Sequence, residues 1–160
     1  VGDYIEAQGN EGTVKEILLF HTIIQTVDLR TIYIPNGQMS TTVVINQSRS
    51  EIRRAQWIVS IEYGNDVAHA KEVIQKCLDA EPRLLREPIS EEGEPLDPFF
   101  IEVTNLNASS VDLTVCAYVK RVDFLDVRFK MNEAIYAAID ADPTLNIPFP
   151  TNTIHIVNKK

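Results

Sequence analysis

Two patterns of apolar and polar residues divide the chain. Up to about residue 49, short runs of β-branched and aromatic residues recur about every 8 to 12 residues, separated by turn-forming residues. Beyond residue 56, apolar residues also recur at the spacing of helix faces. We therefore predict a small all-β domain over residues 1–49, a charged connector over 50–56 and a mixed α/β domain over 57–160.

Residues 31–49 are the best-marked stretch of the first domain. Two predicted strands, 31–34 and 41–45, flank the turn-forming sequence Pro35-Asn36-Gly37. Proline cannot donate a hydrogen bond to a neighbouring strand, and Asn-Gly accepts positive φ angles, so the pattern predicts a β-hairpin. A barrel of about 50 residues with open sheet edges is too small to be stable alone, and we expect partners to cover those edges.

The second domain follows the order β-α-β-β-α-β. Strands are predicted at residues 57–63, 99–105, 111–121 and 152–157, with amphipathic helices after Asp66 and after Asp123. Both aspartates suit a helix N-cap, where a carboxylate accepts from free backbone N–H groups. This order is typical of the ferredoxin-like fold, an antiparallel sheet with both helices on one face.

Residues 86–98 separate the first helix from the second strand and contain three prolines and one glycine, so no regular element is expected there. The segment is strongly acidic. Its acids are Glu87, Glu91, Glu92, Glu94 and Asp97. The composition favours a solvated, hairpin-like insertion.

Charge and composition exclude some classes of function. The net charge is 15 − 23 = −8, and an acidic surface repels phosphate backbones, which disfavours nucleic-acid binding. Cys77 and Cys116 lie within apolar patterns and are expected to be buried, reduced thiols, consistent with a cytosolic compartment. No apolar run approaches the roughly 18 to 20 residues that span a bilayer.

The sequence contains no arrangement of residues typical of an enzyme or a metal site. The histidines, His21, His69 and His155, fall in separate segments without cysteines or carboxylates at metal-ligand spacing. Nucleophile elbows, phosphate-binding glycine loops and paired cysteines are also missing from the sequence. We expect no enzymatic activity and no cofactor, and a metabolite-sensing or adaptor domain stays open as an alternative function.

Several motifs, taken in order, resemble the family of small-conductance mechanosensitive channels (MscS-like). Ile34-Pro35-Asn36-Gly37, followed by Ile45-Asn46 and Ser48-Arg49, resembles the family's signature. Two positions depart from it: Leu29 stands where the family usually has glycine, and Gln25 where a basic residue is common. Further matches are Gly12-Thr13-Val14, Thr26 with Asp28, Arg53-Arg54, Ala108-Ser109-Ser110 and Phe149-Pro150.

The resemblance implies an Sm-like β-barrel followed by a ferredoxin-like domain, together forming the wall of a cytoplasmic vestibule. The whole protein would be a homo-heptamer in the cell membrane, anchored by a transmembrane region before Val1. Membrane tension would open it on hypo-osmotic shock to release ions and small osmolytes. An Sm-like RNA-binding module is the remaining alternative.

The resemblance also assigns expected sites. Subunit contacts are expected at the predicted hairpin, through Ile34, Pro35, Asn36, Gly37, Asn46 and Arg49. The five acids of residues 86–98 would form a negative rim near a vestibule opening and bias which ions enter. For Arg53 and Arg54 the sequence leaves a solvated connector, a salt bridge between subunits or a contact with anionic lipid open.

Overall fold

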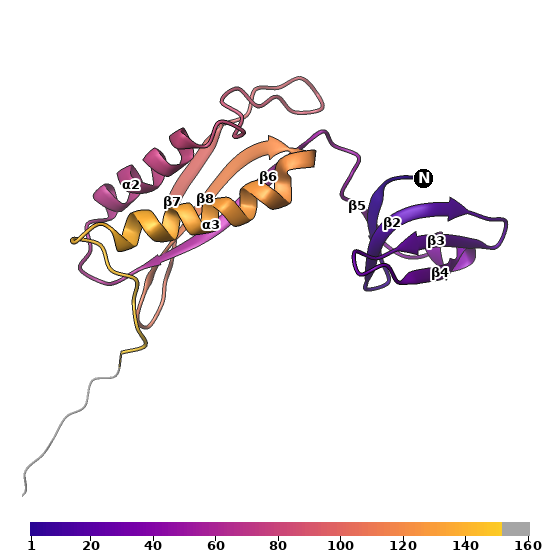
Figure 1. The fold of residues 1–160 in the computed structure, drawn as a ribbon, viewed down its shortest axis with the longest axis horizontal. Helices are drawn as coiled ribbons and strands as arrows, with labels where there is room; N and C mark the ends of the chain where they lie inside the picture. The colour runs from indigo at the N-terminus through magenta and orange to yellow at the C-terminus, as the bar shows by residue number, and fades with distance from the viewer. Residues whose placement is uncertain (152–160) are drawn as a thin grey trace, which may run out of the picture. The chain divides into compact units, whose positions relative to one another are not determined.

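The computed structural model describes residues 1–151, and the chain divides into two compact units, Val1–Glu51 and a second unit that begins at Ile52. The first unit is a five-stranded antiparallel sheet with the strand order β4-β3-β2-β1-β5 (Figure 1). Its elements are β1 (Tyr4–Ala7), β2 (Asn10–Ile17), β3 (His21–Gln25), β4 (Thr31–Pro35), the one-turn helix α1 (Asn36–Met39) and β5 (Val44–Asn46).

The core of the first unit is small. Its cluster of buried apolar side chains is Ile5, Ala7, Val14, Ile24 and Ile34. The close approach of β2 to β3 requires a glycine, because a Cβ atom on Gly12 would lie 2.6 Å from the backbone oxygen of Gln25. With so few buried apolar side chains, this unit depends strongly on the backbone hydrogen bonds between its closely spaced strands.

The β-hairpin predicted over residues 31–45 is wrong. Strands β4 and β5 lie at opposite edges of the sheet and do not pair with each other. Asn36 and Gly37 form the start of α1, and Gly37 does not have a positive φ angle. The side chain of Asn36 bonds across to the β2–β3 turn, so the chain enters a helical turn at the point where the sequence predicts a reversal.

The turn between β3 and β4 places a leucine in the left-handed region of backbone space. Leu29 has a φ angle of 65°, a conformation in which Cβ crowds the following carbonyl in every residue but glycine. Thr26 holds the turn, since its backbone N–H donates to the Arg30 carbonyl at 2.9 Å and its hydroxyl donates to Asp28. Leu29 is the position at which the resembled family usually has glycine.

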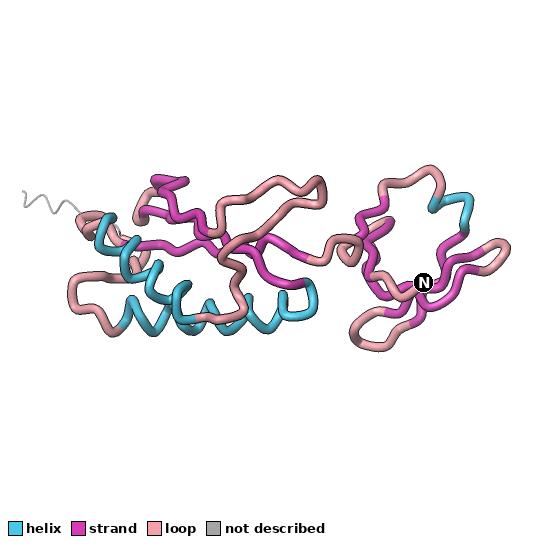
Figure 2. Tube along the Cα trace, turned by 90° about the horizontal axis from the view of Figure 1, so that it is seen from above, coloured by secondary structure: helices cyan, strands magenta, loops and turns pink. Residues whose placement is uncertain are grey.

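The second unit packs two helices on one face of a three-stranded antiparallel sheet (Figure 2). The sheet order is β6-β8-β7, so β8 is paired on both sides. The elements are β6 (Ile52–Ile61), α2 (Val67–Ala80), β7 (Phe99–Leu106), β8 (Val111–Lys120), a 3-10 turn (Arg121–Asp123) and α3 (Phe124–Asp140). The predicted strand at 152–157 lies outside the described residues.

A large apolar cluster fills the space between the helices and the sheet. It includes Trp57 and Val59 of β6, Ile74 and Leu78 of α2, and Met131 of α3. The indole N–H of Trp57 donates to the backbone carbonyl of Arg128 at 2.9 Å and so fixes α3 against β6. This core is complete enough to hold the second unit by itself.

Three local predictions for this unit have different outcomes. Asp66 caps α2 as predicted, accepting from the N–H groups of Ala68 and His69 at 2.9 and 3.2 Å. Asp123 does not cap α3 through its side chain, because a 3-10 turn precedes the helix. The predicted connector at 50–56 is wrong for most of its length, since β6 begins at Ile52 and pairs with the end of β8.

A buried carboxylate joins the end of α2 to α3. Glu81 is only 3% exposed and accepts from Arg83 at 2.8 Å and from Lys130 of α3 at 3.0 Å. Arg86 covers the end of α2 by donating to the carbonyls of Leu78 and Asp79, both at 3.0 Å, which are groups that a helix end leaves without partners. The hydrogen bonds from Arg83, and then from Lys130, hold the pKa of Glu81 at about 2.

We predict that replacing Leu29 with glycine stabilises the first unit. Removing the crowded Cβ regains about 1–2 kcal/mol, less the roughly 0.5–1 kcal/mol that glycine loses on folding, for a net gain of about 0.5–1 kcal/mol. Native-state hydrogen exchange of the β3 and β4 amides measures it. Val27→Gly is the matched control, exposed in the same turn without a positive φ, and should destabilise the unit; equal effects of both substitutions would contradict the argument.

We predict that the Glu81 cluster stabilises the second unit at neutral pH and not in strong acid. A carboxylate whose pKa falls from 4.5 to about 2 on folding contributes stability that is present above about pH 4.5 and lost as the pH falls through about 2. Glu81→Gln should therefore lower the free energy of unfolding by on the order of 3 kcal/mol near neutral pH, and far less at about pH 2. Urea denaturation followed by Trp57 fluorescence measures the difference.

The control for this experiment is Glu133→Gln, which removes an exposed carboxylate of α3. It should leave the unfolding curve unchanged across the pH range. If Glu81→Gln lowers the free energy of unfolding by the same amount at every pH, the cluster does not act through its charge.

Candidate self-association surfaces

The structure separates the six residues expected at a single hairpin. Ile34 is buried in the core of the first unit, and Pro35 ends β4. Asn36 and Gly37 lie in α1, at the β4 side of the sheet. Asn46 belongs to β5, at the opposite edge, and Arg49 is exposed beyond it. The residues expected at one contact therefore lie in two places, one at each edge of the sheet.

Asn36 connects α1 to the turn between β2 and β3. Its side-chain oxygen accepts from the Thr22 hydroxyl at 2.8 Å, and its amide nitrogen donates to the carbonyls of Leu18 and Leu19 at 2.8 and 3.2 Å. Its backbone N–H donates to Phe20 at 2.9 Å. These bonds fix the position of a turn that is far away in sequence.

The turn that Asn36 holds presents an exposed apolar surface. Leu18, Leu19 and Phe20 are 48%, 83% and 72% exposed, and Ile17 before them is also exposed. Residues 17–20 form an apolar run that does not alternate with polar residues, and this run is the signal in the sequence for an exposed apolar turn. Clustered apolar side chains at one turn mark a contact surface.

Asn46 makes the side-chain contacts that hold the β5 edge of the sheet. Its amide donates to the Asp3 carboxylate at 2.8 Å, and its oxygen accepts from the Ser48 N–H at 2.8 Å. The Ser48 hydroxyl in turn accepts from the Tyr4 N–H at 2.9 Å. The short strand β5 is thereby held on β1 while Val44 and Ile45 stay 40% and 50% exposed.

Both edges of this sheet can accept another strand. Within residues 1–151, β4 pairs only with β3 and β5 only with β1. Tyr33 on β4 is 63% exposed, and the three residues of β5 are all exposed. Unpaired backbone N–H and C=O groups on an exposed, apolar edge are a template for pairing with a further chain.

The acidic loop, residues 86–98, folds back on itself like a hairpin. Ile89 bridges to Pro95, the Ser90 N–H donates to the Glu94 carbonyl at 2.8 Å, and Gly93 turns the tip with a φ angle of 85°. All of its acids are exposed: Glu87, Glu91, Glu92, Glu94 and Asp97. The structure therefore presents these carboxylates together, on a loop that three backbone hydrogen bonds keep folded.

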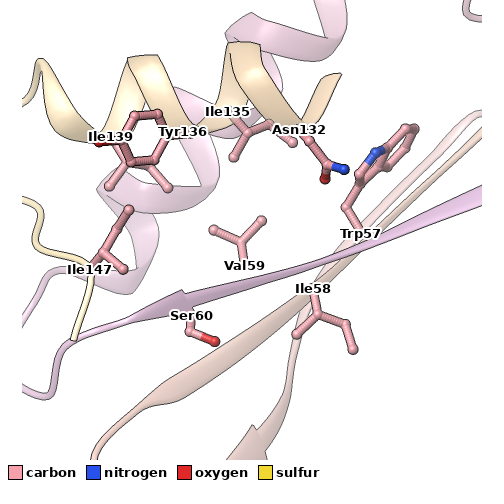
Figure 3. Close-up of a pocket in the computed structure, with 9 residues that line it drawn as sticks. All are labelled: Trp57, Ile58, Val59, Ser60, Asn132, Ile135, Tyr136, Ile139 and Ile147. Atoms are coloured by element: carbon pink, nitrogen blue, oxygen red, sulfur yellow. The ribbon is translucent and has the colours of Figure 1, made fainter. Parts of the chain in front are cut away.

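A groove runs beside β6, where that strand faces α3 (Figure 3). Its apolar part has a volume of about 270 Å³ and lies between Trp57, Tyr136 and Ile147, with Ser60 and Asn132 as polar neighbours. A second part of about 430 Å³ shares Trp57, Ile58 and Asn132 and adds Gln56 and Arg128. No sequence pattern indicates this groove, because its two walls are distant in the chain.

The described residues offer little for catalysis or metal binding. No group of three His, Cys, Asp or Glu side chains within 1–151 could hold a metal ion. His69 contacts the single carboxylate of Asp142 at 2.7 Å, joining the start of α2 to the turn after α3. None of the helices in this part of the chain is long and apolar enough to cross a membrane.

We predict that Asn36→Ala loosens the β2–β3 turn. It removes three side-chain hydrogen bonds, one of them to a buried Thr22, and should cost the first unit about 1–3 kcal/mol. Faster hydrogen exchange at the amides of residues 18–22 is the measurement. Gln38→Ala is the matched control, an exposed side chain of the same helix, and equal exchange rates in both variants would overturn the role given to Asn36.

Comparison with known proteins agrees with the sequence motifs. Residues 1–49 match the family model described as the beta-domain of mechanosensitive ion channels. The small-conductance mechanosensitive channel of Edwardsiella ictaluri is 30% identical over 155 residues, which is 97% of this chain and 51% of that protein. The channel of the same name from Helicobacter pylori is 29% identical over 159 residues, 99% of this chain and 54% of that protein.

Solved structures extend the likeness to both units. The crystal structure of Helicobacter pylori MscS in its closed state has a TM-score of 0.86 and 29% identity, covering 99% of this chain and 59% of that one. Arabidopsis thaliana MSL1, at 20% identity and a TM-score of 0.63 over 87% of this chain and 48% of its own, shares the fold. The chain spans about half the length of the curated relatives it matches. From its motifs, its fold and these likenesses, we conclude that the chain belongs to the MscS-like family of mechanosensitive channel proteins.

Proposed function

We propose that this chain forms the wall of a vestibule on the cytoplasmic side of a tension-gated channel in the cell membrane. The observation that carries the proposal is the match to Helicobacter pylori MscS, which extends over 99% of the chain and both units. The remaining half of the whole protein would supply the membrane-spanning part. Tension favours the channel state with the larger area in the bilayer, and ions and small osmolytes leave through it.

The finer architecture belongs to the same proposal. The first unit is a small Sm-like barrel whose closure needs strands from neighbouring copies. The second is ferredoxin-like: its sheet order β6-β8-β7 is that of the first three strands of such a fold. Both predicted domains, residues 1–49 and 57–160, contribute to the vestibule wall.

Self-association follows from the open edges of the first unit. Copies arranged head to tail in a ring would place β5 of one beside β4 of the next and bury Val44, Ile45 and Tyr33. Such heterologous contacts close into a ring when the rotation between copies permits. We propose a homo-heptamer, with Ile34, Pro35, Asn36, Gly37, Asn46 and Arg49 positioned at the two contacting edges.

The chain would serve as a structural and filtering element without catalysis or a cofactor. Five exposed carboxylates on the acidic loop create a negative local potential that concentrates cations within about a Debye length. Repeated around a ring, they would bias which ions enter the vestibule. The pore itself would lie in the part of the whole protein that precedes this chain.

The test uses the full-length protein in bacteria that lack mechanosensitive channels. We expect it to restore survival of hypo-osmotic shock and to give tension-activated currents in membrane patches. Ile45→Lys should weaken both, because a charge on the β5 edge opposes strand pairing, and should lower the mass of the purified assembly measured by light scattering.

Val27→Lys is the matched control. It places the same charge on an exposed apolar residue in the β3–β4 turn, outside both edge strands, and should leave mass and current unchanged. Correctly inserted protein without tension-activated current would overturn the channel function, and an assembly of unchanged mass in Ile45→Lys would overturn the edge pairing.

A further inference from the structure

The sheet of the second unit has basic residues at one edge and the acidic loop at the other, both beside the same end of β8. On one side of β8, Arg53 of β6 pairs with Val119; on the other side, Leu84 bridges to Val119 and Phe99 pairs with Ala117. The acidic loop connects Leu84 to Phe99, so it leaves the sheet at the β7 edge. Arg53 lies at the opposite edge, across three strands or about 10 Å of sheet.

The β6 edge is basic. The Arg53 guanidinium stacks on the ring of Phe124, 3.7 Å from its centroid, and burial, and then the nearby Arg128, lowers its pKa. Among residues 1–151, neither Arg53 nor Arg128 takes part in an ion pair. The nearby Asp126 carboxylate is already paired with Arg83. The cations at this end are Arg53, Lys120, Arg121 and Arg128, against the acids Glu51 and Asp123, whereas the Arg54 guanidinium lies over the Phe100 ring of β7.

The groove beside β6 begins at this basic cluster. Arg128 lines it together with the amides of Gln56 and Asn132, and the exposed Ile58, at 61%, lies beside them. Hydrogen-bond donors next to an apolar side chain suit an acidic segment that carries an apolar residue. The acidic loop has this composition, with Ile89 58% exposed among its glutamates.

We propose that the acidic loop of one copy docks into the groove lined by Arg128 in the next copy, beside the Arg53 guanidinium. One chain cannot make this contact with itself, because its loop and groove lie at opposite edges of one sheet. Copies placed side by side bring them together, and each copy uses both surfaces, as a closed ring requires. Charge-assisted bonds from guanidinium groups to carboxylates are the strong kind of hydrogen bond, and they fix register between partners.

This inference rests on the self-association proposed above and adds a contact in the second unit. Only the loop carboxylates that the groove does not pair remain to form the negative rim. The test is disulfide trapping in the full-length protein, with Glu92→Cys at the loop tip and Asn132→Cys in the groove. The double variant should give a ladder of covalent oligomers, since every copy carries both halves. Each single variant should give none, which also controls for the native Cys77 and Cys116.

Charge reversal tests the cause of docking. Arg128→Glu in the double-cysteine background should slow disulfide formation more than about tenfold at low salt, because like charges then face each other. Adding Glu91→Lys and Glu94→Lys should restore it. Lys76→Glu, an exposed lysine on α2, is the matched control and should not change the rate.

The outcomes separate the two proposals. An assembly of intact mass without a ladder, a ladder from Glu92→Cys alone, or an Arg128→Glu variant that reacts at the parent rate would each overturn the docking. A protein that is monomeric before any cross-linking would overturn the proposed self-association, and the docking with it.

Discussion

Strand edges that the chain does not pair for itself are the constraint on which the rest of this structure depends. Among residues 1–151, the first unit has such edges at β4 and β5, and the second at β6 and β7. A free edge leaves backbone donors and acceptors that must be satisfied by water or by another chain. The first unit, with five residues in its buried cluster, has the most to gain from neighbours, whereas the second has a core of its own.

Hydrogen bonds and ion pairs of polar side chains fix the positions of segments in both units, in addition to apolar packing. Asn36 ties α1 to a turn some 15 residues earlier, and Glu81 joins two helices through Arg83 and Lys130. Among the described residues, no buried side-chain nitrogen or oxygen lacks a hydrogen-bond partner. Since a buried polar group without a partner is costly, each of these contacts also selects one arrangement of the chain over its alternatives.

Periodicity predicted the regular elements of the second unit well because each one faces a single large core. The two predicted amphipathic helices each bury one side, from Ala70 to Leu78 in α2 and from Phe124 to Ile139 in α3, and Asp66 caps where its sequence position indicates. The failures occurred where a distant contact decides the conformation. Asn36-Gly37 has the composition of a hairpin turn, but its bonds to residues 18, 19 and 22 favour a helical turn.

The sites were less predictable than the fold because they depend on which distant segments the topology brings together. The sequence identifies the acids of residues 86–98 and the arginines at 53 and 54, and it leaves open what each would face. Only the order β6-β8-β7 shows that they lie at opposite edges and at the same level.

That placement also resolves a difficulty raised by the net charge of −8, which should make copies of this chain repel one another. At physiological salt the Debye length is about 8 Å, so contacts are governed by the charges within that reach and not by the total. A chain that segregates its surplus acid to one edge and a cluster of cations to the other can attract its neighbour locally while the assembly as a whole stays acidic.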